Sequence, residues 1–347
     1  MSANSKIEWT DHTFNPWVGC TKVSPACDNC YAERSTPART LGVVWGPTAP
    51  RHRTSPGNWA MPLRWNAQHE AFFNQHGRRQ RVFCASLADV FDNAVDPQWR
   101  VDLLQLIANT PNLEWLLLTK RIGNAHQMLD DALAALSHGI TFWDDIPWPN
   151  VWIGATVVNQ AEFYRDVPKL MAVPAAKHFL SIEPILGPID LGFDIPWQFD
   201  LGKYPDWVIV GGESGPNARP MHPDWARSLR DQCQVAGVPF FFKQWGEWLP
   251  ISQTDGNWTD RLYKSRRIAK GLEDQATLDD IYGRSCTVDN SIVHHDGSLH
   301  GITEPMAFQE GTRAMHTFKV GKKTAGRLLD SQTWDLLPCS WLLEPRA

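Results

Sequence analysis

Three cysteines on one short segment are the residues of this sequence best suited to chemistry. Cys20, Cys27 and Cys30 form a C-x6-C-x2-C array. Thiolates are soft ligands that bind zinc and the irons of iron–sulfur clusters. A closed zinc site takes four protein ligands, and no second CxxC or HxxxH pattern lies near this array. Three cysteines leave one iron of a [4Fe–4S] cluster open, so the array predicts a cluster that can bind a small molecule.

Two other interpretations of the array stay open. Zinc would stabilise the loop in a protein without catalysis, such as a phage accessory or nucleic-acid-binding protein. If Cys84 were a fourth ligand, the cluster would be closed and would suit an electron-transfer or sensor protein. Cys84 also lies within an apolar segment, where a buried thiol packs as a small apolar side chain.

Seven apolar, β-prone segments are expected to position these residues. From the second onward their starts lie 27 to 36 residues apart, close to the roughly 30 residues of one βα unit. Their apolar runs are continuous, which is typical of parallel strands buried on both faces. The sequence predicts an α/β fold, a complete or partial parallel β/α barrel of six to seven strands, over residues 1–245. Residues 246–347 are expected to form a C-terminal cap or extension packed on it. The expected strands are residues 14–18, 81–85, 115–119, 151–156, 178–182, 207–211 and 239–243.

Capping signals mark several elements between these strands. Asp96-Pro97 and His222-Pro223 each supply an N-cap followed by a first-turn proline, and Gly237 is placed to end the second of these helices. Residues 46–57 are rich in Pro, Arg and Thr and predict a long loop with Arg51 and Arg53 exposed.

Polar residues follow the expected strands, and we expect them to meet at one end of the barrel. Chemistry in parallel barrels takes place at the carboxyl ends of the strands. A ring of charges there indicates a wet pocket or a ligand, because burying an unpaired charge costs several kcal/mol. Helix capping and salt bridges between loops, or tight turns at the glycines, are the structural alternative for each member. The candidates for cofactor binding are Ser86, Asp89, Lys120, Thr156, Glu183, Gly211, Gly212 and Glu213.

Four segments together carry a resemblance to a known superfamily. They are KIEWTDHTFNPW at 6–17, the three-cysteine loop, GGESG at 211–215 and FKVGKKTAGRLLD at 318–330. With them the sequence resembles the radical S-adenosylmethionine superfamily, and more narrowly a phage-encoded and bacterial family of three-cysteine radical-SAM-like proteins. The resemblance implies an enzyme with a [4Fe–4S] cluster on Cys20, Cys27 and Cys30 and S-adenosylmethionine at the open iron. An external reductant would then allow cleavage to a 5′-deoxyadenosyl radical that acts on a substrate.

The sequence departs from that superfamily in ways that affect the cofactor contacts. The usual spacing is C-x3-C-x2-C, and Asn29 stands where an aromatic residue normally precedes the third cysteine. The glycine-glycine-glutamate that usually follows the second strand follows the expected sixth strand instead. Either Ser86 and Asp89 or Glu213 would therefore hold the methionine end, and strand order favours the first pair. Lys120 and Glu183 are expected to contact the ribose, the carboxylate or the substrate.

Composition and charge limit the partners of the chain. Of its 347 residues 20% are charged and 43% hydrophobic, without a run of about 18 apolar residues that would span a membrane. The start of the sequence lacks the apolar core of a signal peptide, so we expect a cytoplasmic protein. A net charge of −5 excludes a general polycation. Two basic segments nevertheless suit phosphate and indicate a nucleic-acid or nucleotide substrate, although a solvated face would have the same composition. These segments contain Arg261, Lys264, Arg266, Arg267 and Lys270, and Lys319, Lys322, Lys323 and Arg327.

Overall fold

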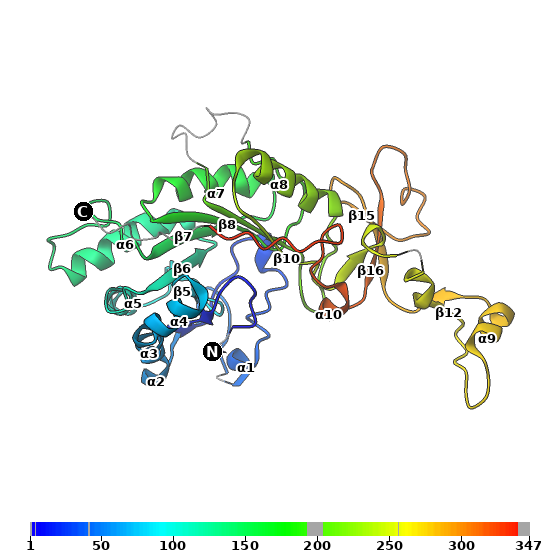
Figure 1. The fold of residues 1–347 in the computed structure, drawn as a ribbon, viewed down its shortest axis with the longest axis horizontal. Coiled ribbons are helices and arrows are strands. Elements are labelled where there is room, and N and C mark those ends of the chain that lie inside the picture. Colours follow the sequence, from blue (N-terminus) through cyan, green and yellow to red (C-terminus); the bar gives the residue numbers. More distant parts are fainter. Residues whose placement is uncertain (1, 4, 41, 193–203, 256, 339–347) are drawn as a thin grey trace.

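Seven parallel strands form an open, curled sheet at the centre of the molecule (Figure 1). The computed structural model describes residues 2–3, 5–40, 42–192, 204–255 and 257–338. The two-residue strand β1 (Ser2–Ala3) pairs antiparallel with β2 at one edge of the sheet. The seven parallel strands confirm the predicted partial parallel β/α barrel of six to seven strands. The parallel strands, in sheet order, are β2 (His12–Thr13), β5 (Gln80–Cys84), β6 (Leu113–Thr119), β7 (Val151–Thr156), β8 (Lys177–Ile182), β9 (Trp207–Gly211) and β10 (Phe240–Gln244).

Long helices follow four of these strands and cover one face of the sheet (Figure 1). Two of them begin at the predicted caps: the Asp96 side chain accepts from the Gln98 N–H at 2.9 Å, and His222 accepts from the Asp224 N–H at 3.1 Å. Gly237 ends the last helix with a left-handed φ of 68°. The helices are α5 (Pro97–Ala108), α6 (Ile122–Leu136), α7 (Gln160–Ala172) and α8 (Pro223–Ala236).

Alternate residues of each strand enter two different cores. One set packs under the helices, and the other fills the opposite, concave face of the curled sheet. The concave core is built largely from aromatic rings, including Trp152 and Trp207, whose ring centroids lie 6.3 Å apart. Burial on both faces explains why the strand sequences are continuously apolar.

The first strand of the sheet is shorter than predicted and begins earlier. His12 and Thr13 pair with β5, and the Phe14 N–H still donates to the Phe83 carbonyl at 2.9 Å. Pro16 then has no N–H to continue the ladder. The chain leaves the sheet there, and β3 (Trp17–Val18) pairs antiparallel with β4 (His52–Arg53). The expected strand at 14–18 is therefore wrong in its bounds, although the chain still emerges at the carboxyl edge of the sheet.

The segment between β3 and β5 carries several short helices and a buried arginine. Arg51 was expected to be exposed, but it is 6% exposed. Its Nε donates to Asp92 at 2.8 Å, because a carboxylate is available to compensate the buried charge. The helices here are η1 (Pro25–Cys27), α1 (Thr36–Thr40), α2 (Pro56–Trp59), α3 (Met61–Ala67) and α4 (His69–His76).

The chain after β10 forms a second, antiparallel sheet and then returns to the barrel. The four strands of this sheet lie in the order β11 (Trp248–Pro250), β16 (Met315–Lys319), β14 (Asn290–Val293) and β15 (Leu299–His300). Between β11 and β14, an excursion extends away from the barrel (Figure 1). It contains η2 (Ile251–Gln253), η3 (Thr259–Leu262), β12 (Tyr263–Lys264), α9 (Gln275–Tyr282) and β13 (Ser285–Cys286).

After β16 the chain passes through α10 (Lys322–Ala325) and runs back along β10. The Trp245 N–H donates to the Gly326 carbonyl at 3.1 Å, and the Phe242 N–H donates to the Trp334 carbonyl at 2.8 Å. In the part of the chain that the structure describes, no helix is long and apolar enough to cross a membrane.

Candidate functional site

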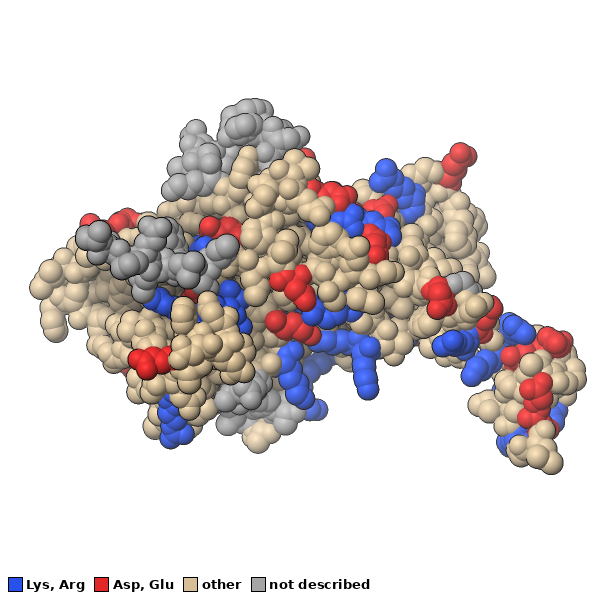
Figure 2. Space-filling view, viewed as in Figure 1, with Lys and Arg blue, Asp and Glu red and all other residues tan. Residues whose placement is uncertain are grey.

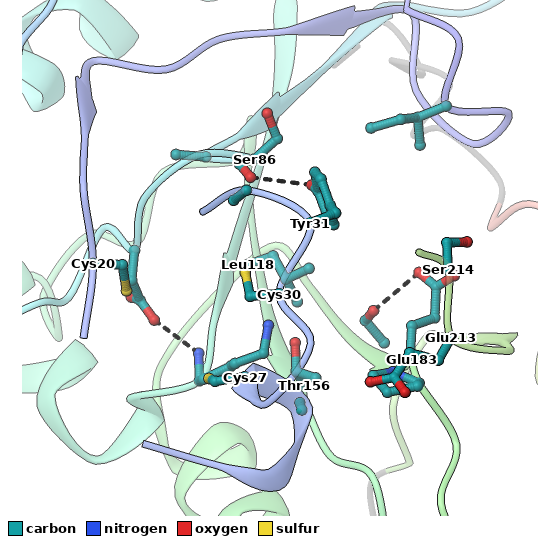
Figure 3. A pocket seen from close by; sticks show the side chains of 18 of the residues that line it. Cys20, Cys27, Cys30, Tyr31, Ser86, Leu118, Thr156, Glu183, Glu213 and Ser214 are labelled. Carbon is teal, nitrogen blue, oxygen red and sulfur yellow. Dashed lines mark hydrogen bonds between the residues drawn. The ribbon is translucent and has the colours of Figure 1, made fainter. Parts of the chain in front are cut away.

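A pocket at the carboxyl ends of the strands gathers nearly all the residues singled out from the sequence. Every predicted site residue lines it except Gly211. In the view of Figure 3, Cys20 lies at one side, Glu183 and Glu213 lie at the other, and Cys27 and Cys30 lie between them. The strand-end argument therefore located the pocket. The ligands assigned to each residue stay a prediction.

The cysteine loop, residues 19–31, is shaped by local turns. Gly19 has a φ of 112°, which favours glycine, and a Cβ there would come within 3.3 Å of the Arg51 side chain. The Ser24 hydroxyl accepts from the Ala26 N–H at 3.1 Å and caps η1, which carries Cys27. Cys27 is buried, whereas Cys20 and Cys30 are half-buried. The three thiols therefore reach the pocket from a loop with defined local structure.

The spacing of the cysteine sulfurs differs from that around a single zinc ion. Tetrahedral zinc with Zn–S bonds of about 2.3 Å places its sulfurs about 3.8 Å apart. Among the described residues, only His126, Asp130 and Asp144 form a group of three or more potential ligands whose atoms all lie within 4.8 Å of one another. The three cysteine sulfurs do not form such a group, so at least one pair of them lies more than 4.8 Å apart. A cluster binds each cysteine through a different iron and needs a wider spacing.

Arg121 holds the Cys20 end of the loop. Its Nη1 lies 3.3 Å from Cys20 Sγ and 3.1 Å from Asp89 Oδ2, and its Nη2 donates to the Thr21 carbonyl at 2.7 Å. Burial raises the pKa of the Cys20 thiol to about 11, and the nearby guanidinium opposes that rise. Arg51 donates to the Thr21 hydroxyl at 2.7 Å from the other side.

Glu213 and Arg219 hold the other end of the loop. Arg219 donates to both carboxylate oxygens of Glu213, at 2.6 and 2.9 Å, and to Asp28 at 3.2 Å. The Asn29 amide also donates to Glu213, at 3.0 Å. Glu213 is 6% exposed, so this bidentate pair compensates its charge. Glu213 therefore fastens the cysteine loop to the end of β9.

Asp89 is used by the chain in a similar way. Its Oδ1 accepts from the Thr119 hydroxyl at 2.6 Å and from the Phe91 N–H at 3.0 Å. Its Oδ2 accepts from the Lys120 N–H at 3.0 Å, in addition to Arg121. The Ser86 hydroxyl lies 3.0 Å from the Asn15 amide nitrogen, and the Ser86 carbonyl accepts from the Tyr31 hydroxyl at 3.1 Å. The acceptor sites of Asp89 are thus occupied within the protein.

The two glycines at the end of β9, Gly211 and Gly212, allow neighbouring segments to approach closely. A Cβ on Gly211 would lie 2.7 Å from Glu183 Oε1, and a Cβ on Gly212 would collide with the Trp245 carbonyl. The Gly212 N–H also donates to the Gln244 carbonyl at 2.9 Å. Close packing of neighbouring segments therefore explains both glycines, although Gly212 also lines the pocket.

Other polar groups in the pocket have no partner in the described part of the chain. The Thr156 hydroxyl and the Gln244 Oε1 are buried without a hydrogen bond. The Lys120 ammonium is half-buried and carries no hydrogen bond or salt bridge to a described side chain. Glu183, in contrast, pairs with Lys243 Nζ at 3.1 Å. A buried polar group without a partner costs free energy, so these groups are suited to a ligand.

Cys84, considered above as a fourth cluster ligand, lies elsewhere. Its side chain is completely buried in the core under the helices and does not line the pocket. Burial raises the pKa of its thiol, which disfavours the thiolate form that binds iron. The wall of the pocket on this side is instead formed by Ala85 and Ser86.

The two basic segments lie in different parts of the structure. Arg261 to Lys270 belong to the excursion around β12, where Arg267 donates to the Tyr282 hydroxyl at 2.7 Å. Lys322 and Lys323 are exposed on α10 and form no salt bridge with a described residue, whereas Arg327 pairs with Asp335. Figure 2 shows Lys and Arg side chains gathered between the cysteine loop and α10, with acidic side chains beside them.

Comparison with protein families decides where the chain is classified. Residues 4–338 match the family described as "Protein of unknown function (DUF5131)". The chain belongs to this DUF5131 family. No curated protein matches it.

Solved structures similar to this DUF5131 protein include mutants of spore photoproduct lyase. A cysteine-to-serine mutant has a TM-score of 0.37 and 13% identity, over 80% of this chain and 72% of that chain. A tyrosine-to-phenylalanine mutant has a TM-score of 0.36 and 12% identity, over 80% and 73%. A double mutant with bound AdoMet and dinucleoside spore photoproduct has a TM-score of 0.34 and 12% identity, over 76% and 67%.

Several pocket residues of this DUF5131 protein were not selected from the sequence. Lys243 and Gln244 end β10 and carry the same polar strand-end signal as the chosen residues, although they were not among the candidates for cofactor binding. Tyr31 follows Cys30 directly, and its position on the cysteine loop was the available signal. Arg219 lies in an irregular loop, and no sequence pattern marks it as the partner of Glu213.

Proposed function

We propose that this protein is a radical S-adenosylmethionine enzyme. Cys20, Cys27 and Cys30 would bind a [4Fe–4S] cluster, S-adenosylmethionine would bind at the iron without a cysteine, and an external reductant would supply the electron. The observation that carries the proposal is that three cysteines from one loop line a strand-end pocket that also contains unpartnered polar groups. In the described part of the chain, no fourth cysteine lines that pocket.

The residues present fit these cofactors in donor type and number. Three thiols provide the soft ligands that iron prefers and leave one iron without a protein ligand. At least one pair of the sulfurs lies more than 4.8 Å apart, which is wider than around a single zinc ion. The unpartnered hydroxyl of Thr156 and carbonyl oxygen of Gln244 can bond to the donors and acceptors of a polar ligand.

The protein residues would bind, orient and shield the cofactors. When bound, the two cofactors supply a 5′-deoxyadenosyl radical that removes a hydrogen atom from the substrate. Among the described residues, the Lys120 ammonium carries no salt bridge, and it is suited to a carboxylate, such as that of methionine. Trp9, Phe83 and Trp45 form apolar parts of the lining and would limit the access of water to a reactive species.

The substrate class that we propose is a nucleic acid or a nucleotide. Lys322 and Lys323 support it, because they are exposed, basic and without salt bridges to described residues. Two backbone hydrogen bonds connect the start of their helix to the pocket residue Glu213. The Gly321 N–H donates to the Glu247 carbonyl at 3.1 Å, and the Glu247 N–H donates to the Glu213 carbonyl at 3.0 Å. Phosphate groups bind to such lysines mainly through charge, so binding would weaken with salt.

Anaerobic reconstitution with iron and sulfide tests the proposed chemistry. We expect four irons per chain, and 5′-deoxyadenosine after reduction in the presence of S-adenosylmethionine. The variant Cys27→Ala should lose both, while Cys286→Ala, which removes a cysteine far along the chain on β13, should keep both. One zinc per chain without iron uptake would favour the zinc-stabilised accessory protein. A four-iron cluster that yields no 5′-deoxyadenosine would favour the electron-transfer or sensor protein.

A further inference from the structure

The two ends of the cysteine loop are held differently. Arg219 bonds to Glu213, Asp28 and the Pro25 carbonyl around η1. Arg121 is the arginine that contacts a cysteine sulfur, with its Nη1 3.3 Å from Cys20 Sγ. Six residues separate Cys20 from Cys27, so the turn that positions Cys27 does not position Cys20. The position of Cys20 depends on contacts from β6 and from the segment after it.

Arg121 is itself fixed before any ligand binds. Its side chain is 9% exposed and bonds to Asp89 and to the Thr21 carbonyl. Asp89 is held in turn by the Thr119 hydroxyl and by two backbone N–H groups. A metal ligand whose outer partners are already in place loses little freedom on binding.

Two largely buried arginine–aspartate pairs lie beside Cys20. Arg121 and Arg51 contribute two positive charges, and Asp89 and Asp92 contribute two negative charges. A cluster bound through thiolates becomes more negative when it gains one electron from the reductant. An N–H bond from a guanidinium to a ligating sulfur stabilises that reduced state more than the oxidised state, which raises the reduction potential.

We propose that Arg121 is a positioning residue that fixes Cys20 for cluster binding and raises the reduction potential of the cluster through its N–H bond to the sulfur. This inference rests on the proposed function, because it requires an iron–sulfur cluster on the three cysteines. It predicts two separable properties. Contacts with Thr21 affect how tightly the cluster is held, and only the contact with Cys20 Sγ affects the potential.

Potentiometric titration followed by electron paramagnetic resonance, together with iron release to a chelator, measures both properties. In Arg121→Met we expect a more negative midpoint potential and iron release about 10 to 100 times faster. Arg121→Lys keeps the charge and should bring the potential back towards that of the wild type. Arg51→Met breaks the bond to Thr21 together with those to Asp92, Gly46 and Ala49, but no bond to a sulfur, so it should release iron faster with a smaller shift of potential than Arg121→Met.

Arg100→Met is the matched control. Arg100 is also buried and donates to the Val90 and Asp92 carbonyls, but it bonds to no residue of the cysteine loop. It should match the wild type in both measurements. If Arg121→Met does not fold, Arg121→Gln, which replaces the charged guanidinium with a neutral and weaker donor, is expected to lower the potential.

Different results would overturn the inference and the proposed function. A loaded Arg121→Met or Arg121→Gln protein with the potential of the wild type overturns the role of Arg121 alone. A shift of the same size in Arg100→Met also overturns it, because the effect would then come from general loosening of the structure. Wild-type protein that takes up no iron overturns both proposals, and metal analysis shows this before any titration.

Discussion

The carboxylates at the two sides of the pocket are fully hydrogen-bonded within the protein, whereas polar groups at its centre lack a partner in the described part of the chain. Asp89 and Glu213 each accept several hydrogen bonds from the chain, and both hold the cysteine loop through an arginine. Thr156, Gln244 and Lys120 present groups without a partner in the described part of the chain. All of them lie at or after the carboxyl ends of strands of one sheet. Position at a strand end therefore places a residue in the pocket, and its bonding decides whether it holds the structure or is available to a ligand.

Removal of Arg219 should have the largest effect on stability. In Arg219→Met the buried Glu213 carboxylate keeps, among the described side chains, only its bond to Asn29, so we expect the free energy of unfolding to fall by about 3 kcal/mol. Urea denaturation measures the change. Arg267→Met, which breaks an exposed pair with Glu273, should cost less than about 1 kcal/mol. Equal small losses would show that Glu213 does not hold the loop.

A methyl group at Gly212 should have the next largest effect. In Gly212→Ala the new Cβ meets the Trp245 carbonyl, and backbone cannot move aside as a side chain can. We expect a loss of about 1 to 3 kcal/mol, measured by thermal or urea unfolding. Gly187→Ala is the control, because a Cβ there meets nothing within 4 Å. If both variants were equally stable, the close approach of β10 would not be required.

Two threonines at neighbouring strand ends distinguish the two kinds of group directly. Thr119→Val removes the bond to buried Asp89 and should destabilise the protein by about 1 to 2 kcal/mol. Thr156→Val removes a hydroxyl without a partner, so unfolding should be unchanged or slightly more costly. In cluster-loaded protein the same Thr156→Val change should weaken S-adenosylmethionine binding about fivefold by calorimetry. A loss of stability from Thr156→Val would contradict the comparison.

The pocket lysines should show the smallest change in stability. Lys120→Met removes a cation without a salt bridge, so the free energy of unfolding should change by less than about 0.5 kcal/mol. S-adenosylmethionine affinity of the loaded protein should fall about tenfold, because a bond to a charged group is lost. Lys243→Met, which leaves Glu183 without its cation, should be the less stable of the two. If Lys120→Met were the less stable of the two variants, Lys120 would hold the structure rather than be available to a ligand.

Much of the barrel could be predicted because burial on both faces leaves a strong signal. The strands Val151–Thr156 and Trp207–Gly211 have the expected bounds, since each is a continuous apolar run. The predicted first strand is displaced because a proline interrupts the hydrogen-bond ladder. The prediction that Arg51 is exposed was wrong because its partner Asp92 lies on another segment. The local sequence pattern therefore predicted the strands, but it could not predict which charged residues pair.

The candidate site shows the same limit. Strand-end position gathered Ser86, Lys120 and Thr156 into one pocket with the cysteines. It could not show that Asp89 is saturated or that Glu213 is bonded to Asn29, 184 residues away in the chain. Such contacts depend on the curl of the sheet, which brings β9 opposite the cysteine loop.

The return of the chain along β10 has a consequence for where this protein can be divided. Phe241 bridges to Asp335, and Trp207 Nε1 donates to the Leu336 carbonyl at 2.9 Å. These contacts cover an edge strand that would otherwise present unpaired backbone groups to other molecules. The second sheet is thus inserted into the barrel's sequence, between β10 and the segment that seals it. A fragment cut after residue 245 would carry an open, aromatic edge prone to self-association, whereas an internal deletion of the excursion around α9 would preserve the seal.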